Sequence, residues 1–268
     1  MKNKPLTLQL EELYNEKWGK LLEQLEQKQI KVKAPFLLSV DKYDEEDYRD
    51  ESWYTDADLK VMIFGQEANR WEWKDEKTPA DVMENYQELY HDDYKVDDSG
   101  TIAFAKQGSR FLCIGFNGFS SQISEYLHNE MPNRRVTFLW NNISKLSAVG
   151  RDGVSGVAVN NETHEIEREF FHVIPDEIEI LKPDVLIFLT GVTDKYNEYI
   201  RENFNVKKES VLLDDYDTRD LAKLDIAGVK LAYRTHHPAS RIDTGEETWT
   251  WYRAILDDIK KNLDTIFQ

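Results

Sequence analysis

The sequence predicts an α/β protein: a three-layer α/β/α sandwich around a central, mainly parallel four-stranded sheet. Four short apolar runs lie along the chain, and longer segments with apolar residues at helical spacing separate them. Strands that are joined by helices of a dozen or more residues form right-handed crossovers and therefore run parallel. Helices then cover both faces of the sheet.

The predicted strands are buried apolar runs that end at glycine or at polar residues. They cover residues 58–65, 135–140, 184–190 and 229–234. The predicted helices cover residues 6–29, about 80–90, 120–129, 164–181 and 193–204, followed by a last helix with the capping-box residues Thr244 and Glu247. Thr193 is the predicted N-cap of the helix that it opens.

The chain has 268 residues and a net charge of −17, and its length fits one domain that spans residues 1–268. Residues 41–100 contain 20 acidic and 7 basic residues, so they carry −13 of that charge. We interpret residues 68–100 as an acidic insertion that is either a solvated surface or a binding surface for a protein partner. Three runs contain no acidic residue, namely 101–124, 131–151 and 231–242, and their cations include Arg134, Arg135, Lys145 and Arg234.

Several classes of protein are disfavoured by the composition. Cys113 is the single cysteine, which excludes an internal disulfide and cysteine-based metal centres. No apolar stretch reaches the roughly 18 residues of a membrane span, and the N-terminus lacks an apolar signal segment. There is also no glycine-rich phosphate loop. We therefore expect a cytoplasmic protein that needs no cofactor or metal.

Polar residues follow three of the predicted strands, at the edge where parallel sheets usually carry functional groups. Gln66 and Glu67 follow the first strand, Asn141 the second and His237 the fourth. A carboxylate and a hydrogen-bond donor suit the cleavage of an N-glycosidic bond, because the sugar becomes positive and the departing base negative. Each residue also has a structural interpretation, as a turn acid, a capping amide or a histidine satisfied by backbone.

The strand-end motifs resemble those of the uracil-DNA glycosylase superfamily. The matching segments are Gly65-Gln66-Glu67, Phe138-Leu139-Trp140-Asn141, His237-Pro238-Ala239-Ser240 and Gly100-Thr101-Ile102-Ala103-Phe104. The resemblance implies that Glu67 activates a water molecule and that His237 polarises the departing base. It further implies base binding by Gln66, Phe104 and Asn141, and contacts with the nucleic-acid backbone by Ser240 and Arg241.

The sequence also departs from the family pattern. Ala68-Asn69 stand where the family has Pro-Tyr, Glu67 replaces an aspartate, and Arg241 replaces an apolar wedge. The resemblance therefore implies a divergent DNA glycosylase that acts in base-excision repair, on a uracil-like or altered base in extruded or single-stranded DNA. The acid-free runs are then the expected DNA-binding face, with weak affinity for duplex.

Two other functions remain open at this point. One is a catalytically inactive module that binds nucleic acid or a nucleotide on the same fold. The other is an unrelated α/β enzyme that acts on a nucleoside-like metabolite.

Overall fold

The computed structural model describes residues 4–43, 49–69, 71–74, 77–87, 94–96, 102–104, 117–237 and 246–267. The chain divides into two compact units. Unit 1 comprises Met1–Glu51, Gln66–Asp93 and Asn142–Lys182, and unit 2 comprises Ser52–Gly65, Tyr94–Asn141 and Pro183–Gln268. The single domain and the role of the acidic insertion stay predictions, and much of residues 68–100 lies outside the described residues.

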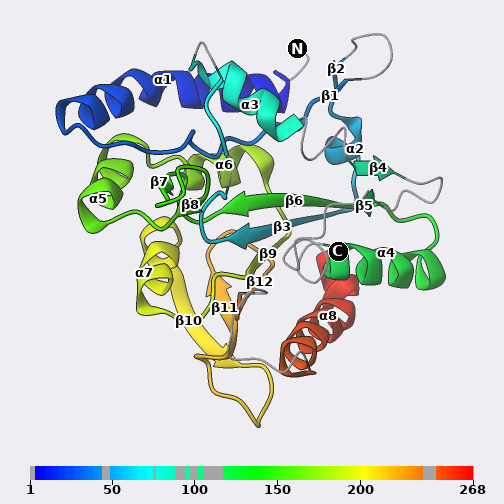
Figure 1. Cartoon of the computed structure of the whole chain (residues 1–268). Coiled ribbons are helices and arrows are strands. Elements are labelled where there is room, and N and C mark those ends of the chain that lie inside the picture. Colours follow the sequence, from blue (N-terminus) through cyan, green and yellow to red (C-terminus); the bar gives the residue numbers. More distant parts are fainter. Residues whose placement is uncertain are drawn as a thin grey trace. The chain divides into compact units, whose positions relative to one another are not determined.

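Unit 2 is built on a six-stranded mixed sheet with the strand order β10-β11-β12-β9-β3-β6 (Figure 1). The strands are β3 (Leu59–Gly65), β6 (Val136–Asn142), β9 (Val185–Phe188), β10 (Val206–Val211), β11 (Leu221–Ile226) and β12 (Leu231–Thr235). β9 pairs in parallel with both β3 and β12. Figure 1 shows β6 beside β3 and pointing the same way. The carboxyl ends of these four strands therefore lie at one edge of the sheet.

The α/β class is confirmed, and all four predicted strands are present, but a sheet of four strands is too small. β10 and β11 extend it as an antiparallel pair, with β11 also antiparallel to β12. β10 reads VKKESV and exposes both of its lysines. An edge strand of this kind has no continuous apolar run, so the apolar pattern of the sequence predicts only the buried strands.

The sheet of unit 2 carries a helix on each face. Tyr233 donates a hydrogen bond to Asp258 of α8 (Glu246–Ile266), whereas the next residue, Arg234, donates to Asn197 of α7 (Asp194–Asn203). Because successive strand residues point to opposite faces, α7 and α8 cover opposite sides. Unit 2 also contains α2 (Ser52–Thr55), α4 (Asn117–Glu130), β4 (Tyr94–Val96) and β5 (Ile102–Phe104).

The core of unit 2 on the α7 side is aromatic. The ring centroids of Phe64 and Phe188, on neighbouring strands, lie 4.9 Å apart. Phe204, the C-cap of α7, packs on both rings at 5.8 Å and 5.2 Å. This cluster fixes α7 on the sheet next to β3 and β9.

Unit 1 packs helices and short ribbons around α1 (Leu6–Gln27). One face of α1 is buried through Leu10, Tyr14, Trp18, Leu21 and Leu25, at the spacing of an amphipathic helix. The other elements are α3 (Pro79–Gln87), α5 (Asn161–Phe170), α6 (Ile174–Leu181), the β1–β2 ribbon (Lys42–Tyr43 and Arg49–Asp50) and the β7–β8 ribbon (Ala148–Val149 and Gly156–Val157). The predicted helix at 6–29 is thus confirmed over nearly its whole length.

The single helix predicted for residues 164–181 is wrong, because the chain forms α5 and α6 with a break at residues 171–173. Pro175 lies in the first turn of α6. Proline has no amide hydrogen and is tolerated only where a helix begins, so it separates the two helices. Thr193 does occupy the N-cap of α7 but makes no side-chain cap bond, and Thr244 lies outside the described residues.

Candidate functional site

The structure places the predicted site residues in both units. Gln66 and Glu67 directly follow β3, are half-buried and belong to unit 1. Asn141 lies inside β6 rather than after it, and His237 follows β12 by two residues, so these two share one edge of the sheet in unit 2. Phe104 ends β5. The side chain of Phe104 lies outside the described part of the chain, as do Ser240 and Arg241.

The segment 66–69, which carries Glu67, is held from two sides within unit 1. The amide of Ser144 donates to the carbonyl oxygen of Gln66 at 3.0 Å. The amide of Gly156, in β8, donates to Oδ1 of Asn69 at 3.2 Å. A Cβ atom at Gly156 would lie 2.1 Å from the carbonyl oxygen of Ala68. Only glycine therefore allows this close approach of β8 to the segment.

We expect Gly156→Ala to displace the 66–69 segment. The added methyl group overlaps a backbone oxygen, so the free energy of unfolding should fall by about 1–3 kcal/mol, which urea denaturation measures. Gly19→Ala is the matched control, because Gly19 lies inside α1 with no atom within 4 Å of the added Cβ. That change should be neutral or stabilise by up to about 1 kcal/mol. Equal effects of the two substitutions would contradict the close approach.

Asn141 is fully buried, and its Nδ2 donates to Sδ of Met62 on the neighbouring strand β3 at 3.5 Å. The β-strand conformation of residue 141 aims the amide into the packed face of the sheet. A base could hydrogen-bond this amide only after the atoms that cover it moved.

His237 is a neutral imidazole at pH 7. Burial lowers the pKa of its side chain to about 4, because the charged form loses hydration. A neutral imidazole can still donate one N–H hydrogen bond to an acceptor that gains negative charge.

The three residues before His237 all bind the acidic loop 213–220. The contacts are Arg234 Nη2 to the carbonyl oxygen of Thr218, Thr235 Oγ1 to the carbonyl oxygen of Asp220 at 2.9 Å, and His236 Nε2 with Oδ1 of Asp220 at 2.9 Å. His236 also stacks on Trp251 of α8, with ring centroids 4.1 Å apart. The end of β12 is thereby fixed immediately before His237.

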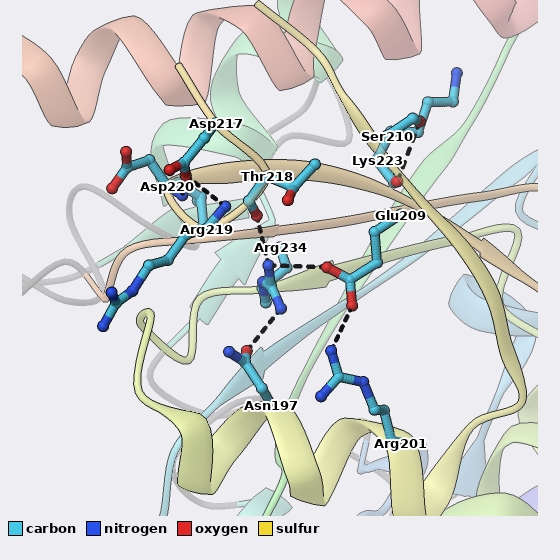
Figure 2. Close-up of polar contacts among 11 residues, drawn as sticks. Asn197, Arg201, Glu209, Ser210, Asp217, Thr218, Arg219, Asp220, Lys223 and Arg234 are labelled. Carbon is cyan, nitrogen blue, oxygen red and sulfur yellow. Dashed lines mark hydrogen bonds and ion pairs between the residues drawn. The ribbon is translucent and has the colours of Figure 1, made fainter.

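Arg234 is almost completely buried, and Figure 2 shows it between α7, β10 and the 213–220 loop. Its Nη1 donates to Oδ1 of Asn197 at 2.8 Å, and its Nη2 forms an ion pair with Glu209 at 3.2 Å. Burial lowers the pKa of the guanidinium, and the Glu209 carboxylate opposes that shift. Arg201 shares Glu209 at 2.8 Å. Arg234 therefore joins α7, β10 and the 213–220 loop inside unit 2.

Four cations of the second and third acid-free runs form ion pairs within the fold, and the expected DNA-binding face stays a prediction. Their partners are acids from other parts of the sequence, whereas Arg151, which ends the second run, is exposed. The pairs are Arg134 with Asp58 at 2.9 Å, Arg135 with Asp56 at 3.9 Å, Lys145 with Glu177 at 2.8 Å, and Arg234 with Glu209 at 3.2 Å. The fold thus places acids from distant segments next to these four cations.

A buried polar cluster in unit 1 was missed by the sequence reading. The Nζ of Lys145 and the hydroxyl of Tyr14 both donate to Oε1 of Glu177, at 2.8 Å and 2.7 Å. Burial lowers the pKa of Lys145 and raises that of Tyr14 well above its usual value. The signal was present, because Glu177 lies among Ile174, Ile178 and Leu181 on the apolar face of its helix.

Glu167 of α5 is the second buried acid of this cluster. Its Oε1 accepts from the amide of Lys145 at 2.5 Å, and its Oε2 lies 2.8 Å from Oγ of Ser144. Burial raises the pKa of this carboxyl to about 7, although these hydrogen bonds oppose the shift.

Among the described residues, no group of three or more His, Cys, Asp or Glu side chains could hold a metal ion. No helix within the described ranges is long and apolar enough to cross a membrane.

The fold and the strand-end residues define an α/β protein with a mixed central sheet. No protein-family model matches the chain, and no curated protein matches its sequence.

Proposed function

We propose that this chain is a divergent DNA glycosylase-like hydrolase, which cleaves the N-glycosidic bond of an extruded, uracil-like or altered base. The observation that carries the proposal is the neutral imidazole of His237 next to the carboxyl end of β12. Glu67 follows β3, and Asn141 is the last residue but one of β6, two other strands of the same sheet. The order of these residues along the chain supports the resemblance that the motifs suggest.

The reaction assigns a separate role to each residue. Water adds to the anomeric carbon and gives its proton to Glu67, while the electron pair of the broken bond stays on the departing base. A neutral His237 would donate its N–H to the base oxygen that gains negative charge. The carboxylate of Glu67 would also stabilise the positive character of the sugar.

The charge distribution favours single-stranded or extruded substrates over tight binding of duplex. The chain carries −17, and four cations of the acid-free runs, Arg134, Arg135, Lys145 and Arg234, are paired with carboxylates. Neutralised cations release few counterions from DNA, so the affinity for non-specific duplex should be low and weakly salt-dependent.

The proposal is tested with end-labelled single-stranded oligonucleotides that contain uracil, hypoxanthine or another altered base at one position. We expect at least one of them to yield an abasic site, detected as alkali-sensitive strand cleavage at that position. The same oligonucleotide with the four normal bases is the control and should stay intact.

The main alternative is a non-catalytic module that binds nucleic acid or a nucleotide. Full burial of Asn141 and the glutamate at position 67 favour it. Binding of an oligonucleotide without an abasic product from any base would establish the module and overturn the hydrolase. Tight binding of a free nucleoside, without binding of any oligonucleotide, would instead indicate an enzyme for a small metabolite.

A further inference from the structure

In unit 1, Glu167 is linked through Ser144 to the segment that carries Glu67. Its carboxyl group contacts the side chain of Ser144 and the backbone of Lys145. The amide of the same Ser144 donates to the carbonyl oxygen of Gln66. We propose that Glu167 is a positioning residue, which fixes the Gln66-Glu67 peptide through Ser144.

The peptide bond is the link to Glu67. The carbonyl oxygen of Gln66 lies in one plane with the amide and the Cα atom of Glu67. A hydrogen bond at 3.0 Å to that oxygen therefore sets the orientation of the plane and the point from which the Glu67 side chain starts. Glu167 acts indirectly, because it holds Ser144, whose amide donates the hydrogen bond to Gln66.

The Ser144 hydroxyl has one hydrogen and two possible acceptors, which explains why a carboxyl group suits position 167. The Ser144 hydroxyl lies 2.8 Å from Oε2 of Glu167 and 2.9 Å from the carbonyl oxygen of Leu146, but it has one hydrogen to donate. An ionised Glu167 takes that hydrogen. A protonated Glu167 donates its own hydrogen to the hydroxyl, which then donates to Leu146. Both forms keep Ser144 bound.

The rest of the buried cluster anchors the neighbouring residue. Lys145 follows Ser144 in the chain, and its ammonium group is held by Glu177 of α6, which also binds Tyr14 of α1. Lys145 is therefore the charged group that acts on Glu167, and Glu177, to which Tyr14 donates, holds the ammonium end of Lys145. Residues 144 and 145 are fixed through both backbone and side chains.

The catalytic meaning of this inference rests on the proposed function, but its structural content can be measured without any activity. We expect Glu167→Ala to speed hydrogen–deuterium exchange of the Ser144 amide by about tenfold or more, because Ser144 loses the carboxyl group that holds its hydroxyl, and the hydrogen bond from its amide to Gln66 then opens more often. Glu167→Gln keeps one acceptor and one donor, so it should restore exchange to within about twofold of the unaltered chain. Glu169→Ala, an exposed change on the same helix, is the control and should have no effect.

A Ser144 exchange rate in Glu167→Ala equal to that of the unaltered chain would overturn the inference. If that variant does not fold, Ser144→Ala decides, since it keeps the amide and removes only the hydroxyl that Glu167 holds. Its amide at 144 should exchange faster, and an unchanged rate again overturns the inference.

The oligonucleotide assay separates this inference from the proposed function. With an active protein, Glu167→Ala should lower kcat about 10- to 100-fold with KM nearly unchanged, and Glu167→Gln should recover most of kcat. Unchanged kcat in Glu167→Ala overturns the inference while the hydrolase stands. Faster exchange in a protein that cleaves no base overturns the hydrolase while the positioning role stands.

Discussion

Replacing Lys145 with methionine is expected to lower the free energy of unfolding by about 3–5 kcal/mol, the usual cost of breaking a buried ion pair. The substitution removes the ammonium group that lies 2.8 Å from Glu177, and Glu177 has no exposed surface. The remaining carboxylate would keep the hydroxyl of Tyr14 as a donor at 2.7 Å but would lose the opposite charge. Urea denaturation at pH 7 measures the loss.

Two further variants identify the cause of that loss. In Lys145→Met/Glu177→Gln the buried charge is gone while Tyr14 keeps an acceptor, so the double variant should be more stable than Lys145→Met alone. Lys28→Met breaks the exposed pair with Glu162 at 2.9 Å and should cost less than about 1 kcal/mol. If Lys145→Met costs no more than Lys28→Met, the ammonium group does not compensate the buried carboxylate.

The buried part of the sheet could be predicted from the sequence, and its edge could not. β3, β6, β9 and β12 are buried over nearly their whole length, so each contains a short apolar stretch that stands out from its surroundings. β10 has two adjacent exposed lysines and no fully buried residue, and its pairing with β11 depends on a partner that local sequence does not specify.

The same limit applies to the site. Glu67, Asn141 and His237 could be singled out because each follows or ends an apolar strand. The role of Arg234 could not, because its partner Glu209 is 25 residues away and comes from the strand that the sequence reading missed. Charge counted along the chain therefore does not show which cations the fold pairs with acids from distant segments.

We expect Glu67→Gln to lower the rate of base release by about 10²- to 10⁴-fold, which is the usual contribution of a general base. The substitution keeps the size of the side chain and removes the group that accepts a proton from water. Single-turnover cleavage of the best oligonucleotide substrate measures the effect. Binding of the same oligonucleotide should change by less than about threefold, because the carboxylate is assigned to the reaction and not to affinity.

Two comparisons make this prediction specific to position 67. Glu169→Gln changes an exposed glutamate of α5 and should leave the rate unchanged. Glu67→Asp shortens the side chain by one methylene group, so a rate within about tenfold of the unaltered chain would show that a carboxylate is needed there. Because the pKa of His237 is about 4, its imidazole is already neutral at pH 5.5, and its ionisation should not appear in the rate between pH 5.5 and 8. A Glu67→Gln rate equal to that of the unaltered chain would remove the Glu67 carboxylate from the reaction and overturn the role assigned to it.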